Sequence, residues 1–143
     1  MSLRQEQWRV ILQNALAQYD RRDAQKLALA AVVSWEQLTS RLIPLLGPDS
    51  VYLIYRRSLD LNKSVFPWLP MESEIHPFRA RFADLRQCLE QQPVDDSLRA
   101  NFCLLYTFVE VLAALIGERL ATDMLRAAFA KAVAPDPPKE TSE

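Results

Sequence analysis

The stretch LIPLLGPDSVYLIYRRSL, residues 42–59, has a counterpart in LAALIGERLATDMLRAAF, residues 112–129, and each contains one of the chain's only two glycines. In both stretches an apolar pattern at helical spacing ends at the glycine, and a second helical pattern follows it. Gly47 and Gly117 therefore predict left-handed helix caps, where a positive φ reverses the chain without steric cost. So few glycines, with half of the residues hydrophobic, predict an all-α fold.

A shift of seventy residues aligns more than the two glycines. The other aligned pairs include Trp8 with Phe78, Leu12 with Phe82, Leu38 with Phe108 and Leu59 with Phe129. The match predicts two three-helix halves, residues 3–62 and 77–133. Because any two amphipathic helices agree in part at a helical offset, the match is either a true duplication or a coincidence of pattern.

Helical periodicity divides the chain into a compact bundle of about six helices within one domain, residues 1–134. The expected helices cover residues 4–20, 24–46, 51–64, 78–92, 97–116 and 118–133, and the fifth, apolar almost all round, should lie at the centre. The expected N-caps are Asp23 for the second helix, Asp49 or Ser50 for the third and Asp95 or Asp96 for the fifth. Pro44 predicts a kink or an early end of the second helix. The tail, residues 135–143, has too little apolar area to order and is expected to be disordered.

Charge and hydropathy exclude several partners. Seventeen basic and eighteen acidic residues give a net charge of −1 without a basic stripe, which argues against nucleic-acid binding. The first ten residues lack the basic-then-apolar order of a signal peptide, so a cytoplasmic protein is expected. The best candidate membrane span, residues 100–117, is slightly short and contains Glu110, so a helix of a water-soluble core is expected instead.

Candidate catalytic and metal-binding residues are few. His76, the only histidine, precedes a proline that favours extended backbone, which argues against a phosphoacceptor, haem ligand or catalytic base. Cys88 and Cys103 match no zinc or redox spacing and are expected to be reduced, buried thiols. The acidic pairs, Glu72 with Glu74 and Asp95 with Asp96, are expected in loops and caps. We therefore predict no enzyme, no metal and no cofactor.

The segment SVFPWLP, residues 64–70, places Phe66, Trp68 and Leu69 on a proline-stiffened loop. These side chains either fill the core between the two halves or anchor a partner protein, since interface hot spots favour such groups. The nearby arginines that would orient a partner are Arg56, Arg57, Arg79, Arg81 and Arg86, and the acids that could neutralise them are Asp60, Asp84 and Glu90. The favoured function is a protein–protein interaction module.

Two other functions remain open. An apolar small molecule could bind among the aromatic residues of the core, namely Trp35, Tyr52, Tyr55, Phe102 and Phe108. Alternatively, an apolar helix face could close a homodimer of a structural protein.

The motifs FPWLP, residues 66–70, and LIGERLATDMLRAAF, residues 115–129, resemble patterns in small helical proteins of bacteria that have no assigned activity. The resemblance covers most of the chain and implies a bacterial, cytosolic, free-standing domain. Small size and the lack of catalytic motifs suggest an adaptor or regulator in a signalling or stress pathway.

Overall fold

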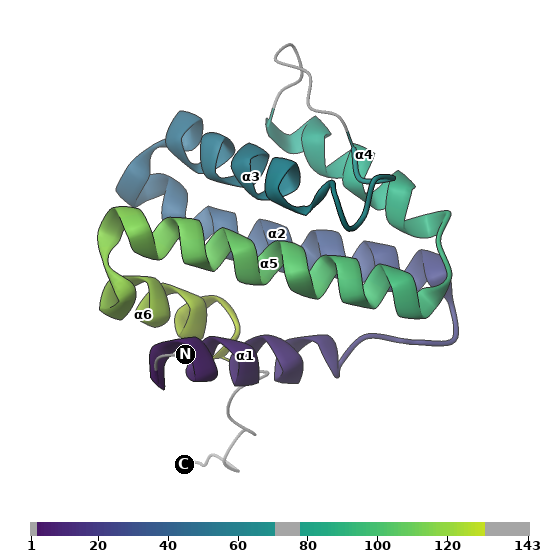
Figure 1. The fold of residues 1–143 in the computed structure, drawn as a ribbon, viewed down its shortest axis with the longest axis horizontal. Helices are drawn as coiled ribbons and strands as arrows, with labels where there is room; N and C mark the ends of the chain where they lie inside the picture. Colours follow the sequence, from purple (N-terminus) through teal and green to yellow (C-terminus); the bar gives the residue numbers. More distant parts are fainter. Residues whose placement is uncertain (1–2, 71–77, 131–143) are drawn as a thin grey trace, which may run out of the picture.

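The computed structural model describes residues 3–70 and 78–130, which form six α-helices (Figure 1). The helices are α1 (Leu3–Leu16), α2 (Ala24–Leu46), α3 (Pro48–Asn62), α4 (Phe78–Glu90), α5 (Val94–Ile116) and α6 (Glu118–Ala128). The predicted all-α bundle is therefore confirmed. The predicted tail, residues 135–143, lies outside the described residues, as do His76, Glu72 and Glu74.

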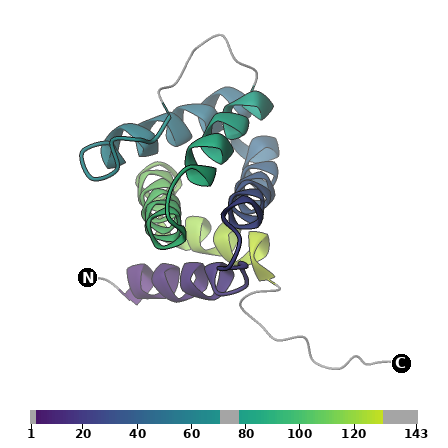
Figure 2. The same ribbon diagram turned by 90° about the vertical axis from the view of Figure 1, so that its right-hand side faces the viewer.

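The six helices form three layers of two. α2 and α5 form the middle layer and run in the same direction, α3 and α4 cover one side, and α1 and α6 cover the other (Figures 1 and 2). α3 and α6 each pack on both middle helices, whereas α4 packs on α2 and α1 packs on α5 and α6. Each three-helix half thus crosses all three layers, and the halves interleave instead of forming two lobes.

The seventy-residue offset relates the backbone and the burial of the two halves. α2 and α5 each contain 23 residues, and both their first and their last residues are seventy positions apart. Every buried residue of α2 has a buried counterpart at this offset in α5. These α2 residues are Leu27, Ala28, Ala31, Ser34, Trp35, Leu38, Thr39 and Leu42. The repeat is therefore a property of the fold and not only of the sequence pattern.

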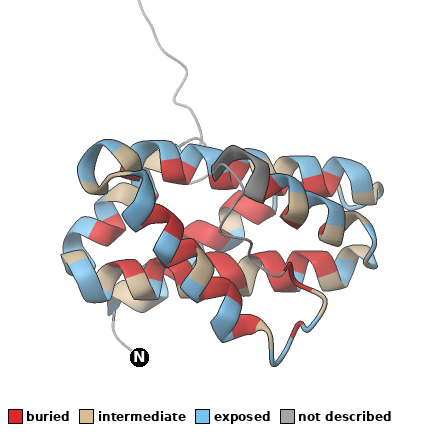
Figure 3. Cartoon of the chain, turned by 90° about the horizontal axis from the view of Figure 1, so that it is seen from above, coloured by how far each residue is buried: buried red, intermediate tan, exposed pale blue. Residues whose placement is uncertain are grey.

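One hydrophobic core joins the helices, with Trp35 of α2 at its centre. The Trp35 ring lies edge-on to Tyr55 and to Phe108, with 5.2 Å between ring centroids in both pairs. In Figure 3 the buried positions follow the inner faces of the helices, and the exposed positions follow their outer edges. This core accounts for α5, whose length and hydropathy alone would allow it to cross a membrane, because α5 packs in the middle layer against α2 and α3.

Both glycines have the predicted positive φ, but their backbone is not that of a left-handed helical cap. Gly47 has φ 86° and ψ 154°, and Gly117 has φ 94° and ψ 152°, a region that is essentially restricted to glycine. Each glycine N–H closes the preceding helix with a 2.8 Å bond, and each glycine carbonyl accepts the first bond of the next helix. The extended ψ is needed because the next helix begins at the very next residue.

Some predicted helix ends were wrong. α1 ends at Leu16 rather than near residue 20, and Pro44 does not end α2 early. Pro44 is exposed, as is Ser40, whose carbonyl would have bonded to residue 44, so water can replace the missing helical donor.

The predicted N-caps were correct at one helix of three. Asp23 caps α2, and its side chain accepts bonds from the N–H groups of Gln25 and Lys26. The other two helices begin earlier than predicted, so the N-cap residues are Gly47 for α3 and Pro93 for α5. The acidic residues predicted as caps there, Asp49, Asp95 and Asp96, lie inside the first turn, where their charge still suits the positive helix end.

Candidate functional site

The predicted partner-binding loop lies mostly in the core. Phe66 is 5% exposed and Leu69 is 3% exposed, while Trp68 is half-buried against the same core. The rings of Phe66 and Trp68 meet edge-on, with 6.0 Å between centroids. Core filling is therefore the correct interpretation for Phe66 and Leu69, and the prediction that they are exposed anchors was wrong.

This loop, residues 63–70, is held on α5, and we refer to it as the plug. The Arg99 guanidinium carbon lies 5.9 Å from the centroid of the Phe66 ring, close enough for a cation–π contact. At the start of the plug, the Asn62 amide donates to Thr107 Oγ1 of α5 over 3.1 Å, and the Phe66 N–H donates to the Asn62 carbonyl over 2.9 Å. The plug thus contacts α5 at Arg99, and Asn62 at the end of α3 holds the start of the plug near Thr107.

The predicted arginines do not form a described cluster around the plug. Arg56 is half-buried and Arg57 is exposed on α3, and the side chain of Arg79 lies outside the described residues. Arg86 pairs with Glu90 one helical turn away, with 3.0 Å between Nε and Oε2. This pair agrees with the expectation that nearby acids neutralise the arginines. Arg99, which was not among the predicted residues, lies over the Phe66 ring of the plug.

The aromatic residues of the proposed small-molecule site pack on one another. Trp35, Tyr55 and Phe108 are fully buried, and the Trp35 ring contacts both of the others. Phe82 of α4 lies 5.1 Å from Tyr55 between ring centroids. Tyr52 is buried as well. Protein side chains therefore fill the space around Trp35, whereas Phe102, the fifth predicted residue, is half-buried and lines a groove of about 580 Å³ with Leu98 and Cys103.

A groove of about 730 Å³ lies on the outer side of α2, and we call it the α2 groove. Its walls come from the end of α1 and from the end of α6, while α2 supplies its floor. Leu29 and Val33, one helical turn apart on α2, are 45% and 42% exposed in it, and the buried Phe129 also lines it. The charged residues of the described lining are Lys26 and Arg41. The groove is thus apolar with a basic rim.

A chain of buried hydrogen bonds fixes one wall of the α2 groove. The Trp35 Nε1–H donates to Asn101 Oδ1 over 2.9 Å, and the Asn101 amide donates to the Tyr19 hydroxyl over 3.4 Å. The Tyr19 hydroxyl is 2.6 Å from Ser34 Oγ, and Tyr19 and Ser34 both line the groove. Burial raises the pKa of Tyr19, so its hydroxyl keeps its proton and its place in this chain.

The two cysteines lack the features of activated nucleophiles. Both are free and half-buried. Burial raises the pKa of both thiols, with Asp84 adding to the effect at Cys88 and Arg99 opposing it at Cys103. A raised pKa lowers the thiolate fraction at neutral pH. Within residues 3–70 and 78–130, no cluster of His, Cys, Asp and Glu side chains could hold a metal ion.

Leu29 and Val33 were missed in the sequence, although a signal for them exists. They are an apolar pair four residues apart that lies off the buried stripe of α2. At the seventy-residue offset they correspond to Arg99 and Cys103 of α5. Comparing the outer faces of the repeats, rather than the shared inner ones, would have identified the pair.

Comparison of the chain with protein-family models, with curated proteins and with solved structures finds no significant match.

Proposed function

We propose that this chain is a non-enzymatic protein–protein interaction module and that its contact surface is the α2 groove. The observation that carries the proposal is the pair Leu29 and Val33, which stand exposed on the floor of an apolar groove while the same helix buries its other face. Exposed apolar side chains gathered in a concave site are typical of places where a partner contributes the missing contacts.

The basic rim gives the surface a charge preference. Lys26 and Arg41 are both exposed at the groove, so an acidic partner segment would approach faster and in a preferred orientation. Binding of this kind suits an adaptor or regulator in a bacterial signalling or stress pathway in the cytoplasm.

Affinity capture from a lysate of the source cells, with matched variants, tests the proposal. The double variant Leu29→Glu and Val33→Glu places two charges on the groove floor at exposed helical positions, where glutamate suits the helix. Leu53→Glu is the control, because Leu53 is 59% exposed on α3 and does not line the groove. Circular dichroism verifies that all three chains are folded.

We expect a protein that the native chain and Leu53→Glu retain and that the double variant loses. Retention of the same proteins by all three folded chains would refute the α2 groove as the contact surface. If the native chain alone has twice the monomer mass and the double variant has the monomer mass, the groove would instead close a homodimer.

A further inference from the structure

A groove of about 580 Å³ lies between α1 and the first half of α5, and we call it the α1–α5 groove. Its apolar lining consists of Leu16 on α1 and of Leu98, Phe102 and Cys103 on α5. Leu16 and Leu98 belong to the core, whereas Phe102 and Cys103 are half-buried between the core and the groove. Small-molecule sites in proteins measure roughly 300–1,000 Å³. The α1–α5 groove therefore has the size and the apolar wall of such a site.

The same groove is lined by two guanidinium groups and one carboxylate, which belong to Arg21, Arg99 and Asp95. All three residues are exposed. In the part of the chain that the structure describes, no ion pair occupies either arginine, and Arg99 lies over the ring of Phe66 instead. The charges of the described lining thus leave one positive charge in excess, which suits a ligand with a single negative charge.

We propose that the α1–α5 groove binds a free carboxylate with an apolar body, of the class of medium-chain fatty acids. The carboxylate pairs with Arg21 and Arg99, because a guanidinium group can donate two parallel N–H bonds to the two oxygens of a carboxylate. The apolar body lies along Leu98 and Phe102, where it leaves water. This site is separate from the α2 groove, so the proposal goes beyond the protein-binding function and does not depend on it.

The charged residues of the groove narrow the class of the ligand. Asp95 repels a second negative charge, so a phosphate monoester, which is largely a dianion at neutral pH, binds less favourably than a carboxylate does. A neutral amphiphile gains nothing from the two arginines. A small polar anion gains nothing from Phe102. A single carboxylate on an apolar body uses both parts of the lining.

Cys103 provides a direct measure of occupancy, and Cys88 is its internal control. Both thiols are free and half-buried, and burial raises the pKa of both. Cys103 lines the α1–α5 groove, whereas Cys88 lies on α4 and does not line the described groove. A ligand along the α5 wall should therefore slow the alkylation of Cys103 by iodoacetamide and leave that of Cys88 unchanged.

The probe is decanoate, titrated below its micellar concentration into the ¹⁵N-labelled full chain while amide shifts are recorded by NMR. We expect saturable binding with shifts centred on Arg99, Phe102 and Cys103, and a smaller shift at Phe66, because Arg99 lies over its ring. Protection of Cys103 from alkylation should follow the same concentration dependence. 1-Decanol, which has the same chain without the charge, should bind about tenfold more weakly, the loss expected for one charge-assisted hydrogen bond.

Matched variants test the two arginines. The double variant Arg21→Gln and Arg99→Gln should bind decanoate about tenfold more weakly or worse. Arg57→Gln is the control, because Arg57 is exposed on α3 and does not line the groove. Asp95→Asn should bind more tightly than the native chain, since it removes the repulsion. Circular dichroism verifies that the chains are folded, and Arg21→Gln alone tests the pairing without removing the contact between Arg99 and Phe66.

No saturable binding up to millimolar decanoate would overturn the proposal. So would equal affinity for 1-decanol, or undiminished binding by the folded double variant, because the arginines would then not hold the ligand. Shifts centred on Leu29 and Val33 would place the ligand in the α2 groove and overturn the proposal as well. None of these results bears on the capture experiment, whose variants lie in the α2 groove, so the two proposals can fail separately.

Discussion

The outer faces of α5 and α2 occupy equivalent positions in the repeat, but they differ in what lies on them. The plug contacts α5 at Arg99, which also lines the α1–α5 groove of about 580 Å³, whereas α2 presents Leu29 and Val33 in the α2 groove. On α5 the plug places the Phe66 ring against Arg99. On α2 the residue equivalent to Arg99 is Leu29, which stands 45% exposed in a groove. Since the helix bounds and the buried positions agree, the difference arises outside the shared core.

The largest effect that tests this comparison should come from the plug. Phe66→Ala removes a buried ring from the plug and should lower the free energy of unfolding by about 3–5 kcal/mol. Leu29→Ala, in the α2 groove, should change it by less than about 0.5 kcal/mol, because the side chain is already in contact with water. Urea denaturation followed by circular dichroism measures both. Equal losses would mean that Leu29 is covered in solution as well as Phe66 is.

The next effect concerns the buried bonds that fix one wall of the α2 groove. Asn101→Leu leaves the Trp35 indole N–H without its acceptor and removes the donor to the Tyr19 hydroxyl, so stability should fall by about 1–3 kcal/mol. The counterpart of Asn101 in α2 is Ala31, which makes no such bond, so the two halves differ at this buried position.

Tyr19→Phe is the matched control for Asn101→Leu. It removes the bond to Ser34 and the long bond from the Asn101 amide but leaves the bond between Trp35 and Asn101, so its cost in denaturant melts should be the smaller of the two. A larger cost for Tyr19→Phe would place the important contact at the groove wall rather than in the centre of the core.

The two glycines test where the repeat is symmetric. A Cβ added at Gly47 or Gly117 meets no described neighbouring atom within 4 Å, so alanine there adds backbone strain without a clash. Gly47→Ala and Gly117→Ala should each cost about 1–3 kcal/mol, and the two losses should agree. Thermal melts of the single variants and of the double variant check both equality and additivity. A clear inequality would show that the two turns are not equivalent in energy.

The glycines also show which features of the fold could be predicted from the sequence. Apolar spacing and two helix breaks were enough to predict the helices and the positive φ, because these depend on local pattern. The ψ of the glycines was not predictable, since it depends on the next helix beginning at once. The interleaving of the halves could likewise not be predicted from the sequence, because it depends on which inner helix faces pack against one another across the bundle.

The candidate site was predicted less well than the fold. An aromatic side chain on a proline-rich loop suits both a core and an interface, and the sequence of Phe66 to Pro70 is the same in either case. What separates the two is burial, which depends on α5 and on Arg99, far away in the sequence. Leu29 and Val33 were missed because an apolar pair on a helix is ordinarily assigned to its core face.

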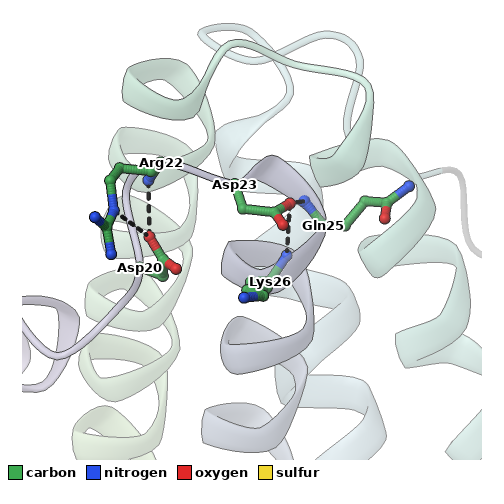
Figure 4. Close-up of polar contacts among 5 residues, drawn as sticks. All are labelled: Asp20, Arg22, Asp23, Gln25 and Lys26. Atoms are coloured by element: carbon green, nitrogen blue, oxygen red, sulfur yellow. Dashed lines mark hydrogen bonds and ion pairs between the residues drawn. The ribbon is translucent and has the colours of Figure 1, made fainter.

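The smallest predicted effect tests a difference between the halves at the start of their central helices. Asp23 caps α2 by accepting bonds from the N–H groups of Gln25 and Lys26 over 2.9 and 3.3 Å (Figure 4). Its counterpart, Pro93, provides no side-chain bond to α5, although the backbone carbonyls of both residues accept the first helical bond.

Asp23→Ala should therefore lower stability by about 1 kcal/mol in chemical denaturation, because two helical N–H groups of α2 lose their acceptor. Asp23→Asn is the matched control and should be close to neutral, since an asparagine oxygen can accept the same bonds. Asp20→Ala, which removes only an exposed contact with Arg22 in the same turn, should change little. If Asp23→Ala lowers stability no more than Asp20→Ala does, the side-chain cap contributes little to the stability of α2. The starts of α2 and α5 would then be equivalent in energy despite their different residues.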